Sequence, residues 1–94
     1  MSKPARHSPE WAAYAEELGA GIARIREARG LSQERAAHKA GISKYTFGLL
    51  ELGRSGRDIP LNPTLWTLLA VAQALEVDLQ ELLPDGAPDI TDGA

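Results

Sequence analysis

Apolar residues recur through most of the chain at the three- and four-residue spacing of amphipathic helices. The first such run carries its apolar side chains at Trp11, Tyr14, Leu18, Ile22 and Ile25. A serine and a proline at residues 8–9 are typical of a helix start, and Gly30 is typical of a helix end. Gly19 and Gly21 each cost about 1 kcal/mol relative to alanine inside a helix. The pattern therefore predicts either one long helix or a short helix followed by a second.

Shorter helical segments follow, and each has a residue that favours a helix start. They are residues 33–40 after Ser32, residues 45–51 after Ser43, an apolar helix from Pro63 to about Leu75, and a last turn over residues 79–83 after Asp78. A long loop over residues 53–62 holds two glycines and one proline. Strand signals are missing, because no stretch alternates apolar and polar residues convincingly. The sequence predicts an all-α fold of about five helices.

Length and composition limit this fold to one small domain. A chain of 94 residues, 44% of them hydrophobic, supports a single core. We expect the domain to span residues 8–83, between a disordered tail over residues 1–7 and an acidic disordered tail over residues 84–94. The chain has no cysteine, and no apolar run approaches the roughly 20 residues of a membrane span. We therefore expect a cytoplasmic protein with no disulfide and no membrane partner.

Charge is distributed unevenly along the chain, although the formal net charge is only -3. Residues 1–57 contain all ten basic residues and six acidic ones, whereas residues 58–94 contain seven acidic residues and no basic residue. Such asymmetry is typical of a polyanion-binding half joined to an acidic remainder. A solvated dipolar surface without a partner would give the same pattern, so charge alone does not decide.

Residues 33–51 (QERAAHKAGISKYTFGLLE) meet the steric requirements of a helix-turn-helix. Gly41 permits the positive φ of a tight turn between two helices. Ala37, four residues earlier, is small enough for the first helix to cross the second closely. Three apolar side chains are placed to fill the space beneath both helices: Ile42, Phe47 and Leu50. An ordinary αα-hairpin has the same needs, so spacing alone leaves both interpretations open.

A longer stretch resembles the helix-turn-helix of the lambda Cro/cI repressor type, also called the xenobiotic-response-element type. The resemblance covers about residues 18–83 and rests on residues 25–27 (IRE), 30–33 (GLSQ), Ala37, 40–43 (AGIS), Glu51, 62–65 (NPTL), 67–68 (TL), Ala72 and 74–75 (AL). It implies a compact five-helix lambda-repressor-like DNA-binding domain, here with an extended N-terminal helix and a long loop between helices 3 and 4. It also implies a homodimer whose third helix enters the major groove of double-stranded DNA at a near-palindromic site.

The resemblance places the base-contacting residues on the recognition helix, residues 43–51. At the matching positions stand Lys44, Tyr45, Thr46 and Leu49. Lysine can donate to guanine O6 and N7, whereas tyrosine and leucine can pack against a thymine methyl. Thr46 could equally face a phosphate, and Leu49 could be a leucine at the edge of the core. Because Gly48 and two leucines leave this helix poor in hydrogen-bonding side chains, we expect modest specificity or a reliance on DNA shape.

Other polar residues are expected to hold the DNA backbone. The resemblance implies phosphate contacts from Gln33 and Ser43, which stand at two helix starts. Arg54 and Arg57 lie in the long loop beside the recognition helix, so phosphates are their natural partners. The weaker candidates are Arg35 and Lys39.

Arg26 and Glu51 resemble a pair that the family uses as an internal salt bridge between helix 1 and the end of helix 3. A planar guanidinium suits a bidentate contact with a carboxylate. We therefore expect both residues to be structural and not to contact DNA.

The fourth predicted helix carries more apolar residues than one buried face needs. Those expected to cover the core are Leu65, Leu68, Val71, Ala72 and Leu75. A second stripe consists of Trp66, Leu69, Ala70 and Gln73. An exposed apolar stripe usually marks a partner, so it forms a dimer interface, packs inside the chain against Trp11, Tyr14, Ile59 and Leu61, or does both. The other dimer candidates are Leu79, Leu82 and Leu83.

The chemistry of an enzyme is missing from this sequence. His7 and His38, with scattered glutamates, make neither a metal site nor a catalytic triad. We expect no cofactor, no metal and no small-molecule ligand, and a sequence-specific DNA-binding transcriptional regulator, a repressor in keeping with the resemblance, that acts as a homodimer. The alternative is a protein-interaction module or an antitoxin of the same fold, which would bind a protein through the acidic tail or the Trp66 face.

Overall fold

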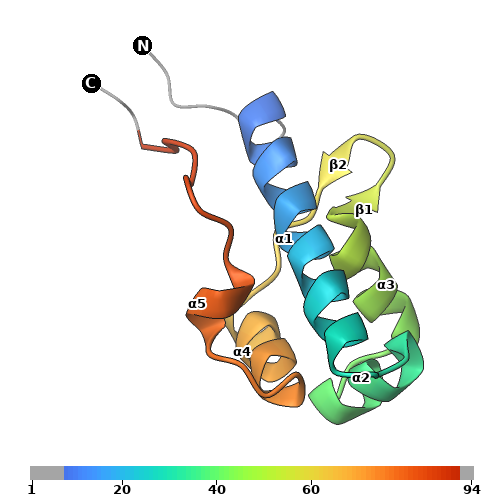
Figure 1. The fold of residues 1–94 in the computed structure, drawn as a ribbon. Helices are drawn as coiled ribbons and strands as arrows, with labels where there is room; N and C mark the ends of the chain where they lie inside the picture. Colours follow the sequence, from blue (N-terminus) through green and yellow to red (C-terminus); the bar gives the residue numbers. More distant parts are fainter. Residues whose placement is uncertain (1–7, 92–94) are drawn as a thin grey trace.

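The computed structural model describes residues 8–91 as five helices and one short hairpin (Figure 1). The elements are α1 (Pro9–Ala28), α2 (Gln33–Ala40), α3 (Lys44–Leu52), β1 (Arg54–Gly56), β2 (Ile59–Pro60), α4 (Leu65–Ala74) and α5 (Leu79–Leu82). The predicted five-helix class is therefore confirmed for this part of the chain. The predicted tail over residues 1–7, and the last three residues of the predicted acidic tail, lie outside the described residues. Within residues 8–91, no helix is both long enough and apolar enough to span a bilayer.

Polar caps begin the helices largely as the sequence predicts. The side-chain oxygens of Ser8, Ser32 and Ser43 each accept a hydrogen bond from the backbone N–H three residues later, at 3.0–3.2 Å. α4 differs from the prediction because Thr64 is its cap, so the helix begins at Leu65 and not at the preceding proline. Such caps satisfy backbone donors that the first helical turn leaves without partners.

α1 runs unbroken through both of its glycines, so the long-helix alternative is the correct one. The reason is the close packing of α1 against α3, which lie side by side in Figure 1. A Cβ atom at Gly19 would overlap the backbone oxygens of Leu50 and Glu51. Gly53, directly after α3, is required by the same packing, because a Cβ atom there would lie 2.6 Å from the backbone oxygen of Ala15 in α1. Glycine at these positions sets the distance between the two helices.

The core is built from α1, α2, α3 and α4, with one residue from α5. Its buried apolar side chains are Leu18, Ile22, Ala36, Ala37, Phe47, Leu50, Val71, Ala72, Leu75 and Leu82, and Ile42 packs partly buried against them. The three side chains expected beneath the helix pair therefore do line the core. Leu65 does not, because it is 63% exposed and α4 buries only residues of its second half, from Val71 onwards.

The long loop contains an antiparallel hairpin, which corrects the expectation of a segment without strands. β1 and β2 pair across a register shift, and the N–H of Leu61 donates to the oxygen of Gly53 at 2.9 Å. Asp58 in the turn has a φ of 59°, a conformation that aspartate tolerates better than most residues. The strands are three and two residues long and contain glycine and proline, so the sequence has no alternation to detect. The hairpin lies beside the first half of α1 (Figure 1).

Candidate nucleic-acid interface

The turn between α2 and α3 has the geometry that the sequence predicts. Gly41 ends α2 with a φ of 74°, and the N–H of Ile42 donates to the oxygen of Ala37 at 3.0 Å. Ala37 itself is 1% exposed, at the place where a small side chain is needed. These features produce a tight helix-turn-helix rather than an open loop between two helices.

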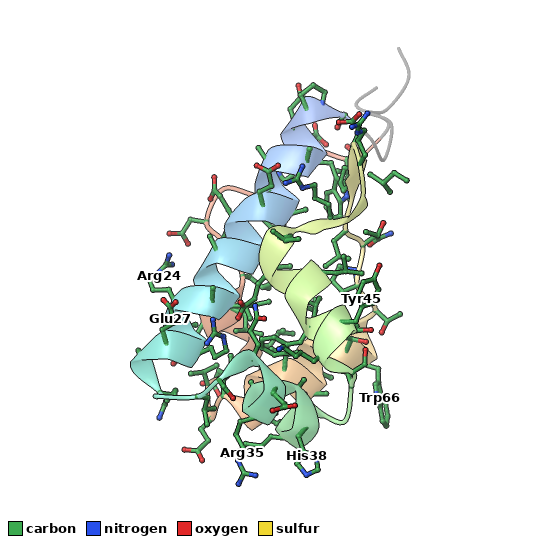
Figure 2. All side chains as sticks on the ribbon, turned by 90° about the vertical axis from the view of Figure 1, so that its right-hand side faces the viewer. Arg24, Glu27, Arg35, His38, Tyr45 and Trp66 are labelled. Atoms are coloured by element: carbon green, nitrogen blue, oxygen red, sulfur yellow. The ribbon has the colours of Figure 1, made fainter. Side chains whose placement is uncertain are left out.

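α3 presents an inner face to the core and an outer face to solvent. Phe47 and Leu50 on the inner face are fully buried. The outer face consists of Lys44, Tyr45, Thr46, Gly48, Leu49 and Leu52, of which all but the half-buried Gly48 and Leu49 are exposed. Figure 2 looks onto this helix and shows Tyr45 projecting from it. All four residues predicted to contact bases therefore lie on the side of α3 that faces away from the core, with Leu49 half-buried.

A hydrogen-bonded network around Glu51 sets the orientation of α3. Arg26 of α1 donates from Nε to Glu51 Oε2 at 2.6 Å and from Nη2 to Oε1 at 3.2 Å. A third nitrogen, Nη1, donates to the backbone oxygen of Leu31 at 2.8 Å. Both charged side chains are largely buried, with exposed fractions of 13% and 8%. The hydrogen bonds and charge of Glu51 raise the pKa of the Arg26 guanidinium, whereas its burial lowers it. The ion pair joins α1 to α3.

Gln33 belongs to this same network, which the sequence did not indicate. Its side-chain Nε2 donates to Glu51 Oε1 at 2.7 Å, so the amide is turned toward the protein at the start of α2. Ser43 is also engaged within the chain, because its hydroxyl caps α3 and donates to Thr46 Oγ1 at 2.9 Å. Gln33 and Ser43 both stand at helix starts, where backbone N–H groups point outward.

Basic side chains lie at both ends of α3. Those exposed at the α2 end are Arg35, Lys39 and Lys44, and those exposed in the hairpin are Arg54 and Arg57. Figure 2 shows Arg35 and His38 below α3, with the hairpin beyond its opposite end. α5 and the acidic segment after it lie on the other side of α1 (Figure 1). The hairpin also carries the exposed Asp58, so the charge asymmetry of the sequence is only partly a separation between two sides of the molecule.

The apolar stripe on α4 stays in solvent. Trp66 is 83% exposed and Leu69 is 39% exposed. Because these side chains are exposed, the alternative in which the stripe packs inside the chain is wrong. Trp11 and Tyr14, two of its expected partners, instead contact each other, with ring centroids 5.9 Å apart. Figure 2 shows Trp66 at the same edge of the molecule as Tyr45.

The other predicted dimer candidates differ from one another. Leu82 is 2% exposed and packs in the core of its own chain, so its assignment to a dimer interface is wrong. Leu79 is partly buried against the same core, and Leu83 is 38% exposed. Of these three leucines, Leu83 therefore offers the most apolar surface to a partner.

A shallow hollow on the outer face of α3 was not foreseen from the sequence. It is lined by Gln33, Lys44, Tyr45, Gly48, Leu49 and Leu52, and we call it the notch. Helical spacing of three and four residues from Tyr45 to Leu52 is the signal that could have revealed it. Among residues 8–91, no cluster of histidine and acidic side chains is arranged to hold a metal ion.

Comparisons with known proteins agree with this architecture. The model of a family described as a helix-turn-helix domain matches residues 17–84. The chain is similar to y4dJ, an uncharacterized HTH-type transcriptional regulator of Sinorhizobium fredii, at 39% identity over 66 residues, which cover 70% of this chain and 78% of that protein.

Two solved structures extend the likeness to three dimensions. The restriction-modification controller protein C.AhdI of Aeromonas hydrophila is 31% identical, with a TM-score of 0.67, over 76% of this chain and 98% of that one. SinR, a master regulator for biofilm formation solved in complex with DNA, is 29% identical, with a TM-score of 0.59, over 69% of this chain and 95% of that one. These relatives are regulators or controller proteins and not enzymes.

Proposed function

Because the chain belongs to the helix-turn-helix family of Cro/cI-type transcriptional regulators, we propose that it represses transcription as a homodimer bound to a near-palindromic DNA site. The observation that carries this proposal is the outer face of α3. It stands clear of the core, its orientation is held by the Arg26–Glu51 ion pair, and basic side chains lie at both of its ends. That combination suits a helix in a major groove between two phosphate backbones.

We assign each residue of the interface a contact with either the bases or the phosphates of the DNA. Lys44 and Tyr45 contact base edges from the first turn of α3, and Thr46 and Leu49 contact the neighbouring bases. Ser43 and Gln33 support phosphate contacts from the starts of α3 and α2, together with the backbone N–H groups there. Arg54 and Arg57 contact phosphates from the hairpin. Bound in this way, two copies would place their α3 helices in successive major grooves about 34 Å apart and would exclude the polymerase.

The second copy is proposed to pack on the exposed stripe of α4. Trp66 and Leu69, together with the exposed Leu65, form the apolar part of this surface. Large aromatic side chains dominate the energetics of protein interfaces when they become buried. Leu79 of α5 and Leu83, directly after this helix, remain the alternative contact, with less apolar surface to offer.

Selection of bound duplexes from a random-sequence library, read by deep sequencing, tests the proposal. We expect an enriched palindrome whose half-sites lie about one helical turn apart. Affinity for it should fall with salt at a log–log slope of about -0.9 for each phosphate contacted. No enrichment, with only weak binding, would contradict the proposal and favour the protein-interaction module or antitoxin. The exposed Trp66 would then be the surface on which to look for a protein partner.

A further inference from the structure

The notch on α3 lies within the surface proposed to face the bases, and its walls are mostly apolar. Tyr45 and Leu52 line it with side chains that are 75% and 57% exposed, and the half-buried Leu49 lines it as well. Lys44 stands at the rim and brings the only charged group among the lining residues. The other polar groups are the Gln33 amide, which donates to Glu51, and the hydroxyl at the end of the Tyr45 side chain. The notch is therefore an apolar recess with one cationic donor beside it.

Gly48 forms this recess, and nothing in the fold requires a glycine there. A Cβ atom at Gly48 would meet no atom within 4 Å, and its φ does not lie in the left-handed region. By contrast, Gly19 is enforced by the backbone of α3. Glycine is less favourable than alanine within a helix, so the fold alone would favour alanine at position 48. The space above Gly48 is open to a group that comes from outside the chain.

We propose that the notch accepts the 5-methyl group of a thymine in the DNA site, an inference that rests on the proposed function. Thymine is the standard base that presents an apolar group in the major groove, and its O4 acceptor lies next to that methyl. Lys44, a donor only, complements the O4 while Tyr45, Leu49 and Leu52 surround the methyl. 5-Methylcytosine carries the same methyl beside an amino donor, which Lys44 would disfavour.

Replacing single thymines of the enriched duplex by deoxyuridine removes only the methyl group and tests this directly. Burial of one methyl corresponds to about fourfold in affinity. We expect one thymine in each half-site to show this loss for the wild-type protein, measured by fluorescence anisotropy. The same duplex with 5-methylcytosine in place of cytosine should bind no more tightly than the unmodified duplex.

Gly48→Ala places a methyl group in the notch and should change stability and binding in opposite directions. The variant should unfold about 4 to 8 °C higher, yet bind the thymine duplex about fourfold more weakly and lose its preference for thymine over deoxyuridine. Gly21→Ala is the matched control, because a Cβ there would meet its nearest atoms at an ordinary 3.6 Å, on the side of α1 that faces Leu82. It should raise the unfolding temperature and leave binding and the thymine preference unchanged. Leu52→Ala, at an exposed position, should also reduce the preference.

The failures of the two proposals are distinguishable. If no duplex is enriched, the DNA-binding proposal fails before the notch is tested. If a duplex is enriched and every thymine tolerates deoxyuridine, or if Gly48→Ala keeps the full thymine preference, the notch assignment is overturned while the regulator stands. Tighter binding to 5-methylcytosine, with no response to deoxyuridine, would also overturn the choice of thymine.

Discussion

The two faces of α3 use one nine-residue helix in opposite ways. On the inner face every large side chain has a partner: Phe47 and Leu50 are in the core, and Glu51 accepts hydrogen bonds from two other elements. On the outer face Tyr45 and Leu52 are exposed, and Gly48 contributes nothing to packing. The inner face therefore determines where the helix lies, and the outer face is left to determine what it binds.

This difference separates the expected effects of substitutions along a single helix. Changes on the inner face should reduce the free energy of unfolding, and binding should suffer only as a consequence. Changes of exposed side chains on the outer face should reduce binding while the free energy of unfolding stays within about 0.5 kcal/mol of the wild type. Gly48→Ala is the exception, because alanine is about 1 kcal/mol more favourable than glycine within a helix.

Glu51→Ala should give the largest effect, because it leaves the Arg26 guanidinium buried without its carboxylate. Removal of one partner from a buried ion pair costs about 3–5 kcal/mol of unfolding free energy. Urea denaturation followed by circular dichroism measures this loss. Glu10→Ala, which removes an exposed acid from the start of α1, is the control and should change little. A loss below about 1 kcal/mol for Glu51→Ala would show that the network is not what orients α3.

Trp66→Glu tests whether the apolar stripe of α4 is, like the outer face of α3, a binding surface that the folding of a single chain does not need. A charge placed in a dimer interface should weaken dimerisation by about 2–4 kcal/mol, as measured by analytical ultracentrifugation. Because Trp66 is 83% exposed, the monomer should remain folded. An unchanged dimer would move the interface to Leu79 and Leu83.

Lys44→Ala and Tyr45→Ala should each weaken binding to the enriched duplex by about 1–3 kcal/mol and barely change binding to random DNA. Their thermal unfolding should match that of the wild type, since both side chains are exposed. Fluorescence anisotropy on the two duplexes gives both affinities. Equal losses on both duplexes would reassign these residues from bases to phosphates.

Arg57→Ala should give the smallest effect, a modest loss of affinity for every duplex. Because one phosphate contact would be removed, the salt dependence of binding should become shallower by about one unit on the log–log plot. Binding titrations at several salt concentrations measure the slope, with Arg24→Ala, on the exposed side of α1, as the control (Figure 2). An unchanged slope for Arg57→Ala would make the arginine ordinary surface charge.

Local chemistry explains which parts of this fold could be predicted from the sequence. The serine caps and the glycines that end α1 and α2 act on their immediate neighbours, so the helices were placed to within a few residues. The pairing of Arg26 with Glu51 was foreseen only through a family resemblance, because 25 positions separate the two residues.

Features that depend on distant contacts could not be predicted in the same way. The sequence predicts that Gly19 weakens its helix. In the fold, Gly19 packs against the backbone of Leu50 and Glu51 in α3, which lie 31 and 32 positions further along the chain. The hydrogen bond from the Gln33 amide to Glu51 could not be predicted either, because 18 positions separate the two residues. The hairpin is too short to produce an alternating sequence pattern. The notch depends on open space above Gly48, which the sequence alone does not reveal.

The most direct test of the account follows the backbone amides of the protein by NMR while the enriched duplex is added. The account predicts that the largest chemical-shift changes fall on residues 43–49, with smaller changes in the hairpin and almost none in α5. Changes centred on α4, with the amides of Tyr45, Gly48 and Leu49 unmoved, would contradict the claim that the outer face of α3 is the DNA-binding surface.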